Sequence, residues 1–118
     1  MTKEKLKDIL ESHLKYLSEE PGGKRANLEN AYLVGANLEN AYLLDAYLVG
    51  ANLENANLVG ANLVGANLEG VNLDRANLYR ADLDRADLNG ANLKEANLKE
   101  ANLLLVNLVG ANLENAYL

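Results

Sequence analysis

The pattern Ala-Asn-Leu-x-x recurs every five residues from position 26 to position 118. Leu stands at the third position of all eighteen full repeats and of a final three-residue fragment. Ala stands at the first position of every repeat except two, where Val71 and Val106 replace it. An internal repeat of this kind determines the architecture, because each unit buries its apolar side chains only against its neighbours.

Neither a helix nor a flat strand accommodates this period. Five residues of an α-helix advance ~500°, so the leucines would spiral around every face. In an unbroken strand, five steps would place successive leucines on opposite faces and leave half of them in water. The period therefore predicts a chain that bends once per repeat, with Ala and Leu pointing inward and the last two residues forming a corner.

The tandem A(D/N)LXX repeats resemble those of the pentapeptide-repeat proteins, and the resemblance covers about four-fifths of the chain. It implies an all-β fold, a right-handed quadrilateral β-helix with four repeats per coil. Residues 26–118 would then make nearly five coils, stacked at ~4.8 Å into a rod roughly 23 Å long. The interior would hold stacked Leu and Ala and no cavity large enough for a ligand.

Residues 2–20 lack the repeat and are expected to form one amphipathic helix. Thr2 is its expected N-cap, and Pro21-Gly22-Gly23 is expected to end it. Its apolar residues fall at helical spacing: Leu6, Ile9, Leu10, Leu14 and Leu17. We expect this face to cover the first coil, with 21–25 as a linker and 1–118 as a single domain. A helix that binds a partner or a membrane surface is the alternative.

The outward positions predict contacts along the axis. Asn at the second position is expected to form amide ladders from coil to coil. Gly or Asn at the fifth position tolerates the positive φ that a tight corner needs. Residues twenty apart should stack, and three such pairs have opposite charges: Asp74 with Lys94, Arg75 with Glu95, and Arg80 with Glu100.

The composition offers little for catalysis. Cysteine is absent, the repeats contain no Ser or Thr, and His13 is the only histidine. Neither a nucleophile with its base nor a His-rich metal site can be assembled, so we expect no enzyme and no cofactor. We interpret His13 as a partly buried or solvated helix residue. Outward Asp82, Asp84 and Asp87 could gather around calcium, although their spacing matches no known loop motif.

The charge is negative overall, at −6, with −7 in the repeats and +1 in residues 1–25. No basic stripe exists to neutralise phosphates, which argues against direct nucleic-acid binding. No apolar signal core or membrane span is present, so we expect a cytoplasmic protein that does not bind membranes. Segments 13–17 (HLKYL) and 22–28 (GGKRANL) resemble the lead-in of small bacterial and prophage pentapeptide-repeat proteins.

These observations predict a structural or protein-interaction module of unknown partner. The alternative is a DNA mimic that inhibits a type II topoisomerase such as gyrase, because some members of the resembled family are acidic rods of that kind. The candidate protein contacts are outward apolar residues. Leu44, Val64 and Leu104 are expected in one column with Leu105 beside it, and Tyr42 and Tyr47 on either side of a corner.

The last coil predicts a second interface. Its leucines and its strand edge would be open to solvent, and such an edge favours association with another chain. We expect a weak homodimer in which two copies meet at this end. The alternatives are a natural chain that continues past Leu118 or a monomer in which the terminal polar groups suffice. Its candidate residues are Leu103, Leu108, Leu113, Tyr117 and Leu118.

Overall fold

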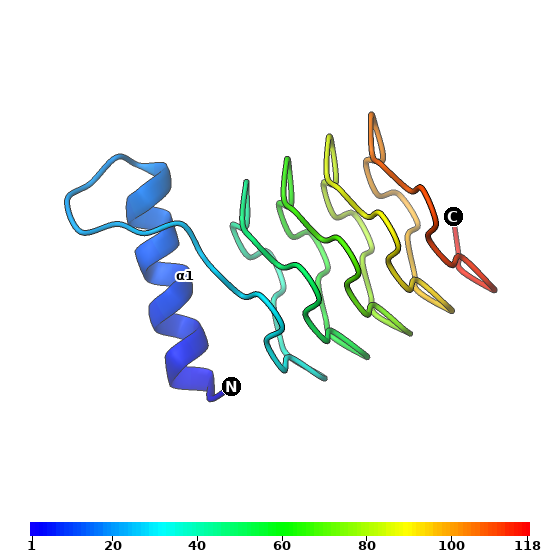
Figure 1. Cartoon of the computed structure of the whole chain (residues 1–118), viewed down its shortest axis with the longest axis horizontal. Helices are drawn as coiled ribbons and strands as arrows, with labels where there is room; N and C mark the ends of the chain where they lie inside the picture. The colour runs from blue at the N-terminus through cyan, green and yellow to red at the C-terminus, as the bar shows by residue number, and fades with distance from the viewer.

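The computed structural model describes residues 1–118 as one helix, α1 (Lys3–Leu17), followed by a solenoid of five-residue turns (Figure 1). No continuous strand forms, because each repeat contributes one bridged residue at its second position. All fifteen bridges are parallel and join residues twenty positions apart, from Asn27 with Tyr47 to Asn97 with Tyr117. The molecule measures 42 × 28 × 21 Å.

Backbone hydrogen bonds run along the solenoid axis. Leu33 N–H donates to the Asn52 carbonyl at 2.8 Å, and Gly35 N–H donates to the Glu54 carbonyl at 2.8 Å. In the opposite direction, Asn52 N–H donates to the Ala31 carbonyl at 2.9 Å. The same three bonds recur through the solenoid, so a repeat with a coil on either side satisfies its backbone polar groups along the axis.

A corner closes every repeat. The N–H of each following Ala bonds back to the Leu three residues earlier, as in Ala36 to the Leu33 carbonyl at 3.0 Å. The fifth position has positive φ in all eighteen full repeats, as a turn with an i to i+3 bond and a left-handed third residue requires. The expectation for Gly and Asn is confirmed. Seven other residues also adopt this conformation: Asp45, Arg75, Arg80, Arg85, Glu95, Glu100 and Leu105.

The interior is built from the first and third positions, as the period predicts. The buried core contains 27 residues, all of them Ala or Leu apart from Val71, which is fully buried among them. The leucines of the last coil are only half-buried or exposed. Figure 1 shows α1 at the opposite end, lying across the first coil.

α1 covers the first coil with a narrower stripe than expected. Leu6, Ile9 and Leu10 pack against the core, but Leu14 is 43 % exposed and the expectation for it is wrong. The next buried position of the stripe is His13, four residues after Ile9, since residues at i and i+4 share a helix face. A histidine thus takes the place of an apolar side chain.

Local signals at both ends set the length of α1. The Thr2 hydroxyl accepts a hydrogen bond from Lys5 N–H at 3.1 Å, which confirms the N-cap. The helix ends at Leu17, before the end of the 2–20 segment, because Glu19 adopts a positive φ of 56°. Glu20 N–H then donates to the Lys15 carbonyl at 2.8 Å, the bond that closes a Schellman motif.

The chain returns beside α1 before the solenoid starts. Lys24 N–H donates to the Ser12 carbonyl at 3.2 Å, and Gly23 packs directly on the helix backbone. A Cβ at Gly23 would lie 2.3 Å from Tyr16 N, so only glycine fits there. The linker therefore follows the helix closely and delivers Ala26 to the first coil.

The corner geometry generates a prediction about Glu95, which has a φ of 56°, and its neighbour Lys94, which has no positive φ. Glu95→Gly removes the cost of a left-handed side-chain-bearing residue and is expected to raise the free energy of unfolding by about 0.5–1 kcal/mol. Lys94→Gly is the matched control and is expected to lower it by about 0.5–1 kcal/mol. Urea denaturation measures both. Equal effects of the two substitutions would contradict the assignment of the corner.

Candidate interaction surfaces

The second position of each repeat supports the outer wall. Asn72 Oδ1 accepts from Asp74 N–H at 3.0 Å and from Asn92 Nδ2 at 3.3 Å, while Asn72 Nδ2 donates to Asn52 Oδ1 at 3.3 Å. The expected amide ladder is therefore present from Asn52 to Asn92. The bond to the residue two positions on was missed, although Asn is known for such local bonds in turns. This bond braces the corner and leaves the Asn side chain little freedom.

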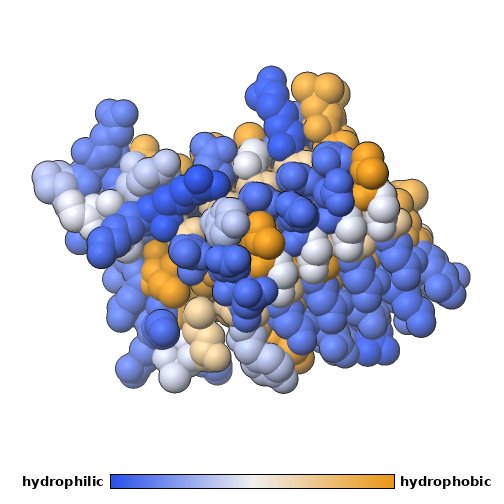
Figure 2. All heavy atoms as spheres, in the orientation of Figure 1, coloured by the Kyte–Doolittle hydropathy of each residue, from blue (hydrophilic) through white to orange (hydrophobic).

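The proposed apolar column is interrupted. Leu44, Val64 and Leu104 do lie in one column, because backbone bonds link their corners, but Asp84 stands between Val64 and Leu104. Leu44 and Val64 are half-buried, whereas Leu104 and Leu105 are 60 % and 68 % exposed. The column is thus two separate apolar groups. On the face drawn in Figure 2, apolar side chains are scattered among hydrophilic ones.

The tyrosines differ in their availability. Tyr42 is 59 % exposed, whereas Tyr47 is half-buried and carries the Arg25 guanidinium 5.8 Å from its ring centroid. Tyr32, which we did not single out from the sequence, is 65 % exposed. All three tyrosines stand at the second position, where most repeats have Asn. A tyrosine cannot form the hydrogen bond that Asn makes to the backbone two residues on. The replacement of Asn by Tyr was therefore the sequence signal for an outward residue that does not brace the corner.

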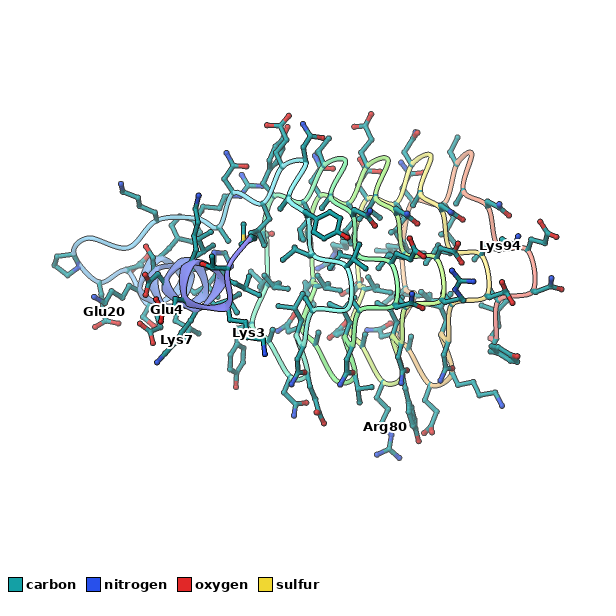
Figure 3. All side chains as sticks on the ribbon, turned by 90° about the horizontal axis from the view of Figure 1, so that it is seen from below. Lys3, Glu4, Lys7, Glu20, Arg80 and Lys94 are labelled. Atoms are coloured by element: carbon teal, nitrogen blue, oxygen red, sulfur yellow. The ribbon has the colours of Figure 1, made fainter.

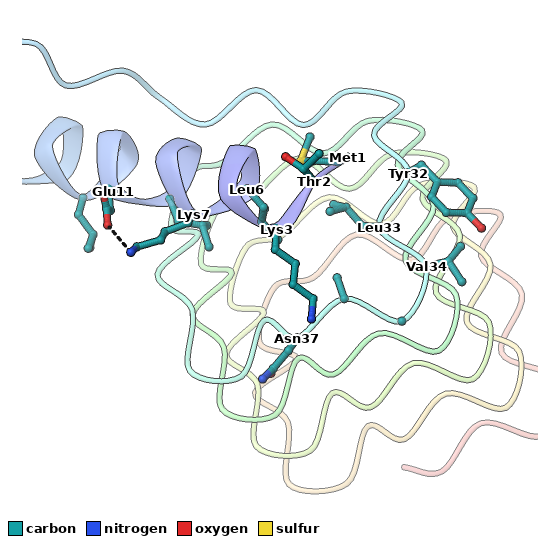
Figure 4. A pocket seen from close by; sticks show the side chains of 14 residues that line it. Met1, Thr2, Lys3, Leu6, Lys7, Glu11, Tyr32, Leu33, Val34 and Asn37 are labelled. Carbon is teal, nitrogen blue, oxygen red and sulfur yellow. Dashed lines mark ion pairs between the residues drawn. The ribbon is translucent and has the colours of Figure 1, made fainter.

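A cleft of about 640 Å³ lies between α1 and the first coil. Leu6, Leu10, Tyr32, Leu33 and Val34 form part of its lining, and Figure 4 shows Lys3 reaching toward Asn37 across it. Lys7 and Glu11 pair at its edge at 3.9 Å. The sequence did not predict this cleft, because we expected the apolar face of the helix to lie over the first coil.

The charged side chains pair along the axis, but not all with the expected partners. Arg80 meets Glu100 at 3.6 Å, as expected. Arg75 instead contacts Glu54 at 2.9 Å and Asp74 at 3.8 Å, and neither the pair with Glu95 nor that of Asp74 with Lys94 forms. Arg75 turns toward Glu54 of the preceding coil, where Asp74 of its own repeat adds a second carboxylate, whereas Glu95 of the following coil stands beside Lys94.

Several exposed ionisable groups shift the pKa values of their neighbours. The hydrogen bond to Glu54, followed by the charge of Asp74, raises the pKa of Arg75. The Tyr79 hydroxyl donates to a Glu100 oxygen, which raises the pKa of Tyr79 and lowers the pKa of Glu100. Figure 3 shows Arg80 and Lys94 projecting away from the interior. These groups are solvated, so they shape the surface field rather than form a catalytic centre.

Of the acidic residues considered for calcium, Asp84 pairs with Arg85 at 3.7 Å, and the other two accept hydrogen bonds within the wall. The Asp82 carboxylate accepts from Asp84 N–H at 3.1 Å and from Asn102 Nδ2 at 3.0 Å. Asp87 accepts from Asn89 N–H at 3.0 Å and Asn107 Nδ2 at 3.2 Å. Both therefore replace Asn in the ladder. No group of three or more His, Asp or Glu side chains is arranged to hold a metal ion, and α1 lacks the length and apolar character needed to cross a bilayer.

The last coil carries the residues that the sequence suggested for a dimer contact. Leu103, Leu108 and Leu113 are half-buried, whereas Tyr117 and Leu118 are 57 % and 75 % exposed. The Lys99 ammonium lies 5.9 Å from the Tyr117 ring centroid. These five candidate residues are therefore gathered at one end of the solenoid, far from the surface near α1.

Known proteins with the same repeat share this fold. Rfr23, a pentapeptide repeat protein from the cyanobacterium Cyanothece 51142, is 38 % identical with a TM-score of 0.77, and the match covers 80 % of this chain and 65 % of that one. A pentapeptide repeat protein from the thylakoid lumen of Arabidopsis thaliana is 31 % identical with a TM-score of 0.74, and the match covers 76 % and 63 %. The chain thus matches less than two thirds of the length of either protein.

Among curated proteins, no significant match is found. The family model for pentapeptide repeats matches eight copies, over residues 24–58, 51–90 and 86–118. These ranges include every repeat identified from the five-residue period. The chain belongs to the pentapeptide repeat family.

Proposed function

We propose that this chain is a non-enzymatic protein-interaction module built on a right-handed quadrilateral β-helix. Four repeats per coil and nearly five coils are part of the proposal. The twenty-residue spacing of all fifteen bridges supports it, because twenty residues are four repeats. A rigid rod of this kind presents side chains at fixed spacing along each wall.

The main support for the proposal is that the interior is filled with apolar side chains, whereas the wall presents side chains to solvent. The 27 core residues fill the solenoid with Ala, Leu and a single Val, so no ligand enters it. Binding is therefore assigned to outward side chains. Tyr42, Leu44, Tyr47 and Val64, which we call the early apolar group, combine half-buried aliphatic residues with an exposed tyrosine. Tyrosine and aliphatic side chains on an outer surface are typical of protein contacts.

Affinity capture tests the early apolar group. The triple variant Tyr42→Ser, Leu44→Ser, Val64→Ser is expected to reduce partner retention at least ~10-fold, since contact residues of this kind contribute more than about 1.4 kcal/mol. The matched control is Val59→Ser, Val109→Ser, which removes outward apolar side chains elsewhere on the solenoid. Partners retained equally by both variants would remove the early apolar group from the interface.

The acidity of the repeats supports one alternative, a DNA mimic that inhibits a type II topoisomerase. Seven net charges over ~23 Å are roughly 0.3 per ångström, against ~0.6 for duplex DNA. The five basic residues of the repeats, Arg75, Arg80, Arg85, Lys94 and Lys99, also lie among the acids, so the wall is not uniformly negative. Inhibition of gyrase supercoiling at micromolar protein would favour this alternative over the interaction module. Cytoplasmic location remains a prediction in either case.

We also propose that this 118-residue polypeptide self-associates weakly through its last coil. The exposed Tyr117 and Leu118 and the half-buried leucines beside them support the proposal. An end face of ~25 Å side offers roughly 600 Å² per partner, below the ~800 Å² of a standard interface. A second copy related by a two-fold axis would present the same surface.

Light scattering over a dilution series tests self-association. The native polypeptide is expected to approach the dimer mass of about 26 kDa, twice the 12.8 kDa of one chain, as its concentration rises. Leu118→Glu places a charge on the end face and is expected to keep the monomer mass, whereas Val59→Glu, on a wall, is expected to leave the association unchanged. A monomer mass for the native polypeptide at every concentration would rule the dimer out.

A further inference from the structure

His13 is the only buried polar residue of the chain, and both of its ring nitrogens are bonded. Nε2 lies 2.9 Å from the carbonyl oxygen of Leu44, and Nδ1 lies 2.9 Å from the backbone nitrogen of Ala26. A carbonyl only accepts and a backbone N–H only donates. The imidazole must therefore be neutral, with its proton on Nε2, for both bonds to form.

These two bonds replace bonds that a preceding coil would supply. Farther along the same column, Asp45 N–H donates to the Val64 carbonyl at 2.8 Å, and the equivalent donor for the Leu44 carbonyl would be the N–H of Arg25. His13 Nε2 supplies that donor instead, while the Arg25 side chain bonds to the Asp45 carbonyl. His13 thus joins α1 to the first coil as one turn of the solenoid joins the next.

The second bond follows the same logic. The N–H groups of later first-position residues bond three residues back, as Ala46 does to the Leu43 carbonyl at 2.9 Å. Because the linker rather than a repeat precedes Ala26, the Ala26 N–H donates to His13 Nδ1 instead. One imidazole therefore holds together α1, the start of the first coil and the end of the same coil.

Protonation would break this arrangement. A proton on Nδ1 would face the Ala26 N–H, which turns an acceptor into a second donor and leaves two hydrogens opposed. Arg25 from the linker and Asp45 from the first coil are the charged groups that face the ring, and Tyr16 of α1 stacks on it with centroids 5.7 Å apart. Burial is the main cause that lowers the pKa of His13, and Arg25 lowers it further, against the Leu44 bond and Asp45.

We propose that His13 is a pH-sensitive latch that holds α1 on the first coil while neutral and releases it when protonated. The released state exposes Leu6, Ile9 and Leu10 together with the leucines beneath them. Because the released imidazole binds a proton more readily than the latched one, the attachment is complete above the ordinary pKa of about 6.5. It weakens as the pH falls below that value.

Nuclear magnetic resonance on the native chain tests the latch directly, since its one histidine gives one set of imidazole signals. We expect the Nε2–H tautomer at pH 7.5 and a titration midpoint below 6.5. Amide protection factors of residues 3–45 should fall up to ~tenfold per pH unit below 6.5, the slope of one proton. Those of residues 86–100 should stay constant. A mixed tautomer population, or a midpoint at or above 6.5, would overturn the proposal.

His13→Gln is the matched variant, because a glutamine amide also donates and accepts but does not titrate in this range. Its protection factors in residues 3–45 are expected to be independent of pH between 7.5 and 5. Asp45→Asn removes the facing carboxylate and is expected to keep the pH dependence. If His13→Gln lost protection with the same pH profile as the native chain, another group would be responsible and the latch would be excluded.

Discussion

The left-handed corner at every fifth residue is the constraint on which the structure depends. It turns the chain after each Leu, so that Ala and Leu of every repeat face the interior and the second residue faces the wall. The backbone N–H and carbonyl groups are then directed along the axis, where the adjacent coil satisfies them. Seven residues other than Gly and Asn accept the cost of this φ, which shows that the stacking of neighbouring coils outweighs local backbone preference.

The first and the last coil described here differ in what covers their core residues. At the first coil, α1 supplies apolar side chains, and His13 supplies the hydrogen bonds that a further coil would have made. At the last coil of this polypeptide, Tyr117 and Leu118 are exposed. The middle coils have a filled interior, so only their walls are open to solvent.

The sequence predicted those features that one repeat determines by itself. The period defined the inward Ala and Leu, the Gly and Asn corners followed from turn chemistry, and Thr2 marked the helix start. The Arg80–Glu100 pair and the amide ladder also followed from the twenty-residue spacing, whereas two other contacts between distant segments were missed. The partner of Arg75 depends on the charges that stand beside Glu54 and Glu95, and the role of His13 depends on a linker that brings Ala26 to it. Asp84 lies between Val64 and Leu104 in the stacked column, so the column that was predicted to be apolar is interrupted by a charge.

Disulfide trapping tests the stacking register most directly, because the chain contains no cysteine of its own. Asn57 and Asn77 are bridged and twenty apart, and Cα atoms stacked at ~4.8 Å lie within the range a disulfide spans. Asn57→Cys with Asn77→Cys is expected to cross-link within the monomer on mild oxidation. Asn57→Cys with Asn72→Cys, fifteen apart, is expected to stay reduced. Cross-linking of the second pair in preference to the first would contradict four repeats per coil.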